Sequence, residues 1–284
     1  MPWDVESILV DNKPLATTGG RVWDAARACA QFLSQTGMYH DILSRPGARL
    51  LELGAGCGWL GLAITNNVAK DTAELVCLTE RAEGGGLAHL ECNLLLNSGS
   101  SRSNLVTAEL DWVEVTKEEK TAIPLRIRRS TCATYSPFDQ AATFVDTDQM
   151  VDRWDFIFGS DLVYEEKAGV VALSRLLRKL LLRVDTTSPR PTALYAHTKR
   201  RFEHLDMLFY RELARQGLKV KEVFHTEGQK RPTSPPPMLE RLEMGWDPNF
   251  PDMRVAMLEI TAADDGEEVV PYDLKVLENV GMML

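Results

Sequence analysis

Hydrophobic and polar positions along the chain alternate between short apolar runs and segments with helical spacing. Short apolar or β-branched runs bounded by glycine or acidic residues predict buried strands. They cover residues 49–56, 75–80, 104–112, 154–164, 192–199, 218–224 and 255–261. Between them, apolar residues recur at helical spacing, which predicts helices over 22–35, 61–69, 87–97 and 202–217, and in a Leu- and Arg-rich segment ending at Arg183. This alternation predicts an α/β fold: a Rossmann-like, seven-stranded, mostly parallel sheet with helices on both faces.

The connection between the last two predicted strands adds a further detail of the fold. Only a proline-rich loop separates the strands predicted at 218–224 and 255–261, which predicts an antiparallel C-terminal hairpin. We expect one domain over residues 1–284. It has an N-terminal strand and helix extension at 1–48, an insertion at 114–153 and an acidic tail at 264–284. The PLRIRRS stretch predicts a strand of an inserted hairpin.

The stretch LLELGAGCGWLG, residues 50–61, carries the first chemical signal. It contains a literal G-x-G-x-x-G at Gly56, Gly58 and Gly61, which by itself predicts a dinucleotide site. A dinucleotide site needs its first glycine directly at the strand end. Here the strand ends at Gly54, so the fitting frame is Glu52-x-Gly54-x-Gly56-x-Gly58. The third glycine position of the dinucleotide motif then falls on Trp59, whose bulk opposes close packing of helix on sheet.

Two acidic residues bear on which ligand the glycine loop binds. Glu52 precedes the glycine loop, where its charge would repel a pyrophosphate but would favour S-adenosylmethionine, which carries a sulfonium and an ammonium group. Glu80 ends the next predicted strand, where an acid can accept hydrogen bonds from ribose hydroxyls. Glu80 serves both ligand classes, so Glu52 and the glycine frame indicate S-adenosylmethionine.

With GGRVWDAA at 19–26, Glu52 to Gly58, Glu80, Leu110-Asp111-Trp112 and SDLVY at 160–164 in this order, the chain resembles the seven-β-strand methyltransferases. More narrowly, it resembles the METTL21-like group of protein-lysine methyltransferases, whose hallmark is a D-x-x-Y after the fourth strand. The resemblance implies an enzyme that transfers a methyl group to a lysine side chain of a non-histone protein, such as a chaperone or a translation factor.

The resemblance also implies a role for each matching residue. Trp23 packs beside the cofactor, the segment Gly54, Ala55 and Gly56 takes its methionine part with Glu52 and Gly58 flanking, and Glu80 holds its ribose. Asp111 and Trp112 line the adenine site, and Ser160 lies against the cofactor at the end of the strand predicted at 154–164. The open alternatives are that Trp23 and Trp112 are core aromatics and that Asp111 is a turn residue.

Asp161 and Tyr164 are the expected catalytic residues. Their spacing brings both side chains to one rim if the chain is helical there. A carboxylate attracts the incoming ammonium group, and a tyrosine completes the pocket. The alternative is that Asp161 caps the following helix. His197, in YAHTK, has no partner visible in the sequence, and we assign it no catalytic role.

Composition limits the partners. The formal net charge of −9 at pH 7 opposes binding to a phosphate backbone and favours a basic protein partner. No N/D-P-P-Y/F motif for adenine methylation occurs after the fourth strand. No apolar run is long enough for a membrane span, and the N-terminus does not resemble a secretory signal, so we expect the cytoplasm or the nucleus. The five cysteines show no metal-ligand spacing, so we expect no metal. A monomer is the default expectation.

Two other functions fit the same residues. The first is methyl transfer to another acceptor: a protein histidine, an N-terminal amine or a small molecule. The second is a cofactor-binding scaffold without activity, although the presence of Glu52, Glu80, Asp161 and Tyr164 argues against a decayed site.

Overall fold

The computed structural model describes residues 3–15, 18–97, 104–117, 123–130, 144–163, 166–182, 189–199, 204–223 and 254–271. The chain divides into two compact units. Unit 1 comprises Met1–Asp111 and Lys120–Ser160, and unit 2 comprises Trp112–Glu119 and Asp161–Leu284. Tyr164 and much of the insertion predicted at 114–153 lie outside the described residues.

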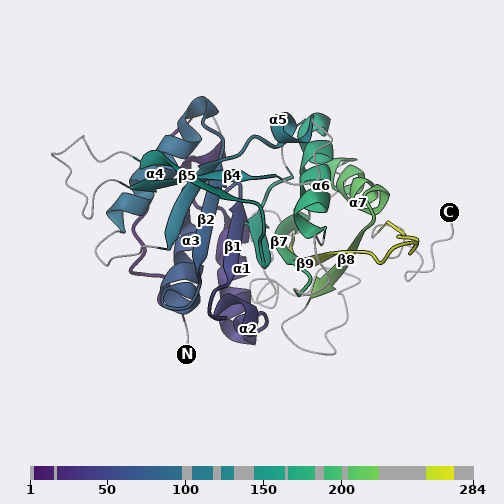
Figure 1. Ribbon diagram of the computed structural model, residues 1–284, viewed down its shortest axis with the longest axis horizontal. Coiled ribbons are helices and arrows are strands. Elements are labelled where there is room, and N and C mark those ends of the chain that lie inside the picture. The colour runs from purple at the N-terminus through teal and green to yellow at the C-terminus, as the bar shows by residue number, and fades with distance from the viewer. Residues whose placement is uncertain are drawn as a thin grey trace. The chain divides into compact units, whose positions relative to one another are not determined.

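Unit 1 is built on four parallel strands. They are β1 (Arg49–Leu53), β2 (Leu75–Glu80), β3 (Leu105–Glu109) and β6 (Phe156–Ser160), in the spatial order β3-β2-β1-β6. The chain runs from β1 outward to β2 and β3, and then returns to β6 on the other side of β1 (Figure 1). This reversal creates a topological switch point between the carboxyl ends of β1 and β6, where sheets of this type bind their ligands.

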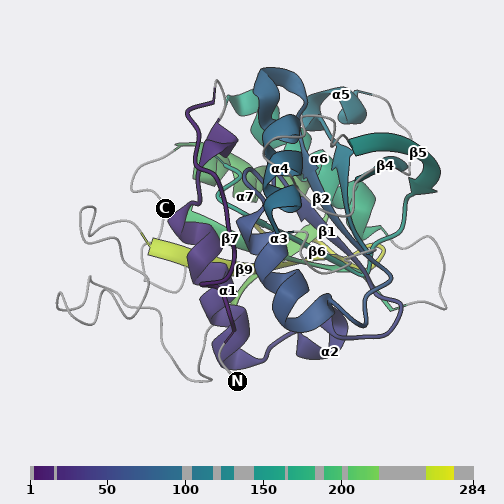
Figure 2. The same ribbon diagram turned by 90° about the vertical axis from the view of Figure 1, so that its left-hand side faces the viewer.

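The helices of unit 1 pack around these strands because each buries an apolar face. They are α1 (Asp24–Thr36), α2 (His40–Leu43), α3 (Trp59–Ile64), which continues into a π-helical turn (Thr65–Ala69), and α4 (Gly86–Leu96). Two 3-10 turns, η1 (Thr18–Gly20) and η3 (Glu83–Gly85), precede α1 and α4. Figure 2 shows α3 and α4 together over the strands that they connect. Consecutive βαβ crossovers of one hand give this arrangement.

A hairpin extends the sheet of unit 1. Strands β4 (Leu125–Ser130) and β5 (Phe144–Val151) pair antiparallel with each other, and β4 pairs antiparallel with β3. The guanidinium of Arg128 on β4 contacts Glu91 on α4 at 2.7 Å and Asp146 on β5 at 3.0 Å. Thr107 on β3 also donates to Glu91, at 3.1 Å. The carboxylate of Glu91 therefore links the hairpin to both β3 and α4.

Unit 2 contains three antiparallel strands, β7 (Thr192–Lys199), β8 (Leu218–Val223) and β9 (Arg254–Ala262), in the order β7-β9-β8. Its helices are α5 (Trp112–Thr116), α6 (Lys167–Leu181) and α7 (His204–Arg215). Helix α6 packs against α5, α7, β7 and β9, while α7 packs against β8 (Figure 1). The antiparallel pairing of β8 with β9 confirms the predicted C-terminal hairpin.

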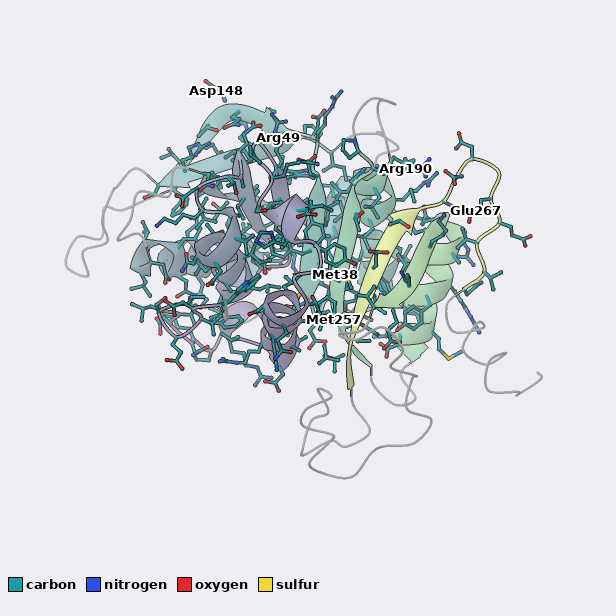
Figure 3. The ribbon with its side chains drawn as sticks, turned by 90° about the horizontal axis from the view of Figure 1, so that it is seen from below. Met38, Arg49, Asp148, Arg190, Met257 and Glu267 are labelled. Carbon is teal, nitrogen blue, oxygen red and sulfur yellow. The ribbon has the colours of Figure 1, made fainter. Side chains whose placement is uncertain are left out.

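The start of the acidic segment after β9 is attached to unit 2 by ion pairs. Arg190 contacts Asp264 at 2.6 Å, and Lys219 contacts Glu267 at 3.0 Å; Figure 3 labels Arg190 and Glu267. Hydrogen bonding to the cation comes first among the causes that hold the pKa of each carboxyl below its usual value. These four side chains are largely exposed, so the pairs add little stability.

The α/β, Rossmann-like fold class predicted from the sequence is confirmed. The four parallel strands of unit 1 and the three strands of unit 2 correspond to the seven predicted strands, and β4 and β5 are additional. The strand predicted at 104–112 is too long, because β3 ends at Glu109 and Trp112 begins α5. Helix α2 and strand β5 had no prediction of their own. The proposed division into extension, insertion and tail stays a prediction.

Candidate functional site

The glycine loop begins where β1 ends. Gly54, Gly56 and Gly58 have φ angles of 56°, 56° and 80°, a left-handed conformation that glycine adopts without a steric penalty. The N–H of Ala55 donates to the carbonyl of Thr79 at 2.8 Å, and the N–H of Gly58 donates to the carbonyl of Ala55 at the same distance. The loop therefore crosses to β2 and folds back to start α3 at the switch point of unit 1.

Glu80 lies against this loop. One oxygen of its carboxylate, Oε2, accepts a hydrogen bond from the N–H of Gly56 at 2.8 Å, and Oε1 accepts one from the N–H of Arg81 at 3.0 Å. A β carbon added to Gly86, the first residue of α4, would lie 2.9 Å from Cγ of Glu80. The glycine at the start of α4 thus leaves room for the Glu80 side chain beside the loop.

Glu52 is buried inside unit 1, with 2% of its surface exposed. Burial raises the pKa of its carboxyl well above 4.5, the charge of Glu80 adds to the increase, and the backbone N–H of Gly61 partly offsets it. Within the described residues its Oε2 atom makes no hydrogen bond. Burial therefore favours the neutral form of this acid over its charged form.

The sequence argument gave Gly61 no role, and the structure assigns it one. A β carbon at Gly61 would lie 2.2 Å from Cδ2 of Leu78 and 2.4 Å from Oε2 of Glu52. Only a glycine lets α3 approach β1 and β2 this closely, which is the function of the third glycine in G-x-G-x-x-G loops. The literal G-x-G-x-x-G motif that ends at Gly61 was the signal in the sequence from which this role could have been predicted. Trp59, two residues earlier, is buried at the first turn of α3 instead.

The segment before α1 covers the loop. A β carbon at Gly56 would lie 3.3 Å from the carbonyl oxygen of Gly19, so η1 runs directly against the loop. Trp23 follows η1, donates from Nε1 to the carbonyl of Thr18 at 3.1 Å, and lies under the guanidinium of Arg21 at 3.8 Å. Its ring is half-buried. Trp23 is therefore held beside the glycine loop by its own neighbours and is not a core aromatic.

Two more predicted residues follow strand ends of unit 1. Leu53 of β1 is paired with Gly159 of β6, so Ser160 ends β6 level with the start of the glycine loop. The N–H of Leu110 donates to the carbonyl of Glu80 at 3.1 Å, which brings half-buried Asp111 to the ends of β2 and β3. Unit 1 thus contains the following predicted cofactor residues, whose role in binding stays a prediction: Trp23, Glu52, Gly54, Ala55, Gly56, Gly58, Glu80, Asp111 and Ser160. Trp112 belongs to unit 2, where it begins α5.

Asp161 adopts a conformation that its sequence context did not predict. Its φ is 51°, in the left-handed region that few residues other than glycine, asparagine and aspartate occupy. Its N–H donates to the carbonyl of Ala196 on β7 at 2.9 Å, and its side chain is buried. The helical turn that would bring Asp161 and Tyr164 to one rim is therefore not present at residues 161–163. Asp161 does not cap α6 either, because the residue at the N-cap of α6 is Glu166.

The thiols and acids of the described residues form no metal centre. No three His, Cys, Asp or Glu side chains in this part of the chain lie close enough together to hold a metal ion. Burial is the main cause that raises the pKa of Cys29 to about 12 and that of Cys57 to about 11, so both thiols stay protonated. Across the described helices, none combines the length and apolar character needed to cross a membrane.

The residues at this edge of unit 1 fit S-adenosylmethionine. The loop presents backbone of three glycines, the Glu80 carboxylate beside Gly56 can accept from a ribose diol, and the buried acid Glu52 lies underneath. A pyrophosphate would meet the Glu80 carboxylate here, whereas a sulfonium or ammonium group is favoured by it. The donor set thus agrees with a cationic nucleoside cofactor.

Comparison with known proteins supports this assignment. Residues 4–125 match the family model described as lysine methyltransferase. This stretch contains η1, Trp23, the glycine loop, Glu80 and Asp111, which are the residues that build the cofactor edge. Among curated proteins, none matches the sequence significantly.

Solved structures with a similar chain path include several methyltransferases. Aeropyrum pernix fibrillarin, solved with S-adenosyl-L-methionine bound, is 16% identical over 90% of this chain and 86% of its own, with a TM-score of 0.45. A methyltransferase from Pyrococcus furiosus is 15% identical over 81% and 83% of the two chains, with a TM-score of 0.39. A precorrin-6y C5,15-methyltransferase from Geobacter metallireducens is 11% identical over 89% and 98%, with a TM-score of 0.41. At these TM-scores, the assignment rests on the family match and on the site residues.

Proposed function

We propose that the chain is an S-adenosylmethionine-dependent methyltransferase of the seven-strand type, and that it transfers a methyl group to a lysine side chain of a non-histone protein. The observation that carries the lysine assignment is the match of residues 4–125 to the lysine methyltransferase family model. The buried carboxylate of Asp161, directly after Ser160 in the chain, supports it. The cytoplasm is the proposed site of action.

Different residues of unit 1 bind different parts of the cofactor. Glu80 accepts hydrogen bonds from the ribose hydroxyls, and the backbone of Gly54 to Gly56 receives the methionine part. Trp23 and Asp111 border the ligand. When bound, S-adenosylmethionine supplies an electrophilic methyl group on a sulfonium. The protein's contribution is to hold this group with its methyl carbon open to the acceptor and to exclude water.

The acceptor amine must be neutral when it reacts. A free lysine has a pKa of about 10.4, so nearly all of it is charged at pH 7. Asp161 attracts the ammonium group by its charge, and burial of the amine then favours loss of its proton to solvent. After deprotonation, an N–H of the amine donates to the Asp161 carboxylate, which orients the nitrogen lone pair. Positioning of this kind supplies much of the rate without acid-base catalysis.

Cofactor binding is the first test. Isothermal calorimetry of the full chain with S-adenosylmethionine should give saturable binding, and Glu80→Gln should weaken it because the amide is a poorer acceptor for the ribose diol. A wild-type protein that binds no cofactor at about 1 mM would contradict every methyltransferase function for this chain.

Methyl transfer is the second test. The purified enzyme is incubated with cell extract and S-adenosylmethionine labelled on its methyl group, and the labelled residue is identified by mass spectrometry. We expect methyl-lysine in a protein band. Asp161→Asn is the matched variant, because asparagine tolerates φ of 51° and removes only the charge. It should lower the labelling rate about 10- to 1,000-fold with cofactor affinity unchanged. Label on histidine, an N-terminus or a small molecule would support that acceptor and reject lysine.

A further inference from the structure

The hydroxyl of Tyr195 on β7 holds the backbone that follows Asp161. Its Oη atom accepts hydrogen bonds from the N–H groups of Leu162 at 2.9 Å and Val163 at 3.1 Å. The N–H of Asp161 donates to the carbonyl of Ala196, the residue after Tyr195. Three consecutive N–H groups are therefore held by two adjacent residues of one strand.

The same hydroxyl is connected to a second pair of polar side chains. Nδ1 of His197 lies 3.2 Å from Oη of Tyr195, and Nε2 of His197 lies 3.3 Å from Oδ1 of Asp206 on α7. Tyr195 already accepts from two backbone groups, so its own hydrogen is directed to His197. Nδ1 is then the nitrogen that accepts from Tyr195, whereas Nε2 and Oδ1 of Asp206 lie close together without forming a hydrogen bond with each other. The chain of contacts runs from Asp206 through His197 and Tyr195 to the Asp161 turn.

All members of this chain of contacts are inside unit 2. His197 is 0% exposed, and Tyr195 and Asp206 are buried as well. The ring of His197 packs at 5.2 Å from that of Tyr195 and at 6.1 Å from that of Phe209. Burial first, and then the charge of Asp161, raises the pKa of Tyr195 well above 10, so the hydroxyl keeps its hydrogen. A histidine enclosed in this way cannot take a proton from a protein substrate.

The geometry of the turn explains what these contacts achieve. A left-handed aspartate is less stable than an extended or helical one by about 1 kcal/mol or more, so surrounding contacts must hold it in place. The left-handed φ decides the direction in which the Asp161 carboxylate leaves the backbone. Asp161 and the two residues that follow it donate their N–H groups to Ala196 and Tyr195. These hydrogen bonds can therefore fix the direction of the Asp161 carboxylate.

We propose that Tyr195 and His197 are positioning residues that hold the turn at Asp161 in the left-handed conformation needed to present its carboxylate to the acceptor amine. This inference rests on the proposed function for its catalytic consequence. Its structural part, the retention of the Leu162 and Val163 amides by Tyr195, stands independently. The two residues act through Asp161 and do not touch the reacting atoms.

The test compares two variants of the full-length enzyme. Tyr195→Phe removes the hydroxyl and keeps the ring, so the Leu162 and Val163 amides lose their shared acceptor. Phe209→Leu is the control, because Phe209 packs against both Tyr195 and His197 but supplies none of the hydrogen bonds. Three quantities are measured: amide hydrogen exchange at residues 162 and 163, cofactor affinity by calorimetry, and the initial rate of methyl labelling of extract protein.

Tyr195→Phe should speed exchange at the two amides and slow labelling, each by about tenfold or more, as expected for loss of a buried acceptor. Its cofactor affinity should stay within about twofold of wild type, because the cofactor residues of unit 1 are untouched. Phe209→Leu should lower the melting temperature but leave exchange and labelling near wild type. His197→Leu, which removes the acceptor for the Tyr195 hydrogen, should follow Tyr195→Phe.

Unchanged exchange at residues 162 and 163 in Tyr195→Phe would overturn the proposal. Equal loss of labelling in Tyr195→Phe and Phe209→Leu would overturn it too, because packing alone would then account for the effect. If wild-type enzyme labels an acceptor other than lysine, the proposed function fails, while the same comparison of rates still tests the positioning role.

Discussion

At the scale of single residues, unit 1 buries a carboxyl group whose charged form is disfavoured by that burial. Glu52 has almost no exposed surface, and its Oε2 is close to where a β carbon at position 61 would be. Isolating a carboxylate in this position is costly, which favours the protonated form. Arrival of a cationic ligand above the loop would favour ionisation of the same group.

Glu52→Gln should therefore change how stability depends on pH. The pKa of Glu52 is raised well above 4.5 in the folded state, so folded protein keeps a proton that unfolded protein releases. Its contribution to stability is complete below about pH 4.5 and is lost as pH rises toward the folded pKa, by up to about 1.4 kcal/mol per pH unit. Glutamine has no such loss, so the variant should gain stability relative to wild type as the pH rises from about 4.5 toward the folded pKa.

Urea denaturation at several pH values measures this difference. Glu83→Gln is the control, because it makes the same chemical replacement at an exposed side chain. A Glu52→Gln variant whose stability relative to wild type is the same at every pH would show that Glu52 is ionised in the folded protein.

At the scale of elements, asparagines of α4 hold the N-terminal strap, which we define as residues 3–15. Asn97 accepts from the N–H of Leu9 at 3.0 Å and donates to its carbonyl at 2.6 Å. Asn93, one turn earlier, accepts from the N–H of Asp11 at 2.8 Å and donates to the carbonyl of Cys57 in the glycine loop at 3.1 Å. One buried amide thus joins the strap to the loop.

Asn93→Leu should loosen both segments. Leucine has a similar volume but cannot bond, so two buried backbone groups lose their partner, and the free energy of unfolding should fall by about 2 kcal/mol or more. Hydrogen exchange measured by mass spectrometry should increase in the strap and in the loop together.

Asn67→Leu is the comparison variant. Asn67 bonds to Asp4 at the exposed start of the strap and does not reach the loop. Its replacement should affect only residues near position 4. Faster exchange confined to the strap in Asn93→Leu would show that the loop does not depend on this amide.

At the scale of the whole molecule, we propose that net charge contributes to the choice of partner. A formal charge of −9 would favour a basic protein over nucleic acid at a distance. Such attraction is screened by salt, since the Debye length is about 10 Å at 0.1 M ionic strength.

Raising NaCl from about 50 to about 300 mM should therefore increase KM for a basic protein acceptor several-fold, with a much smaller change in kcat. Labelling rates measured over this range with the purified acceptor test the prediction, and cofactor affinity at the same salt concentrations is the control. A KM that does not change with salt would mean that local contacts, and not the overall charge, recognise the acceptor.

The sequence by itself determined the succession of the strands along the chain and the place of the glycine loop after β1. Alternating apolar runs predict parallel strands, and glycines after a strand predict left-handed turns, since both depend on residues that are neighbours in the chain. The glycine loop and Glu80 could be located at strand ends for this reason. A shared rim for Asp161 and Tyr164 required a helical turn from Asp161, and Asp161 is left-handed, with its N–H bonded to β7.

Only the tertiary structure decided the contacts between residues that are distant in sequence. The packing of Gly61 on Leu78, the retention of the strap by Asn93, and the link from Asp206 through His197 and Tyr195 to the Asp161 turn are of this kind. Local patterns cannot show which buried donor meets which acceptor, because that choice depends on how strands and helices pack. His197, without a partner in the sequence, therefore acquired two in the fold.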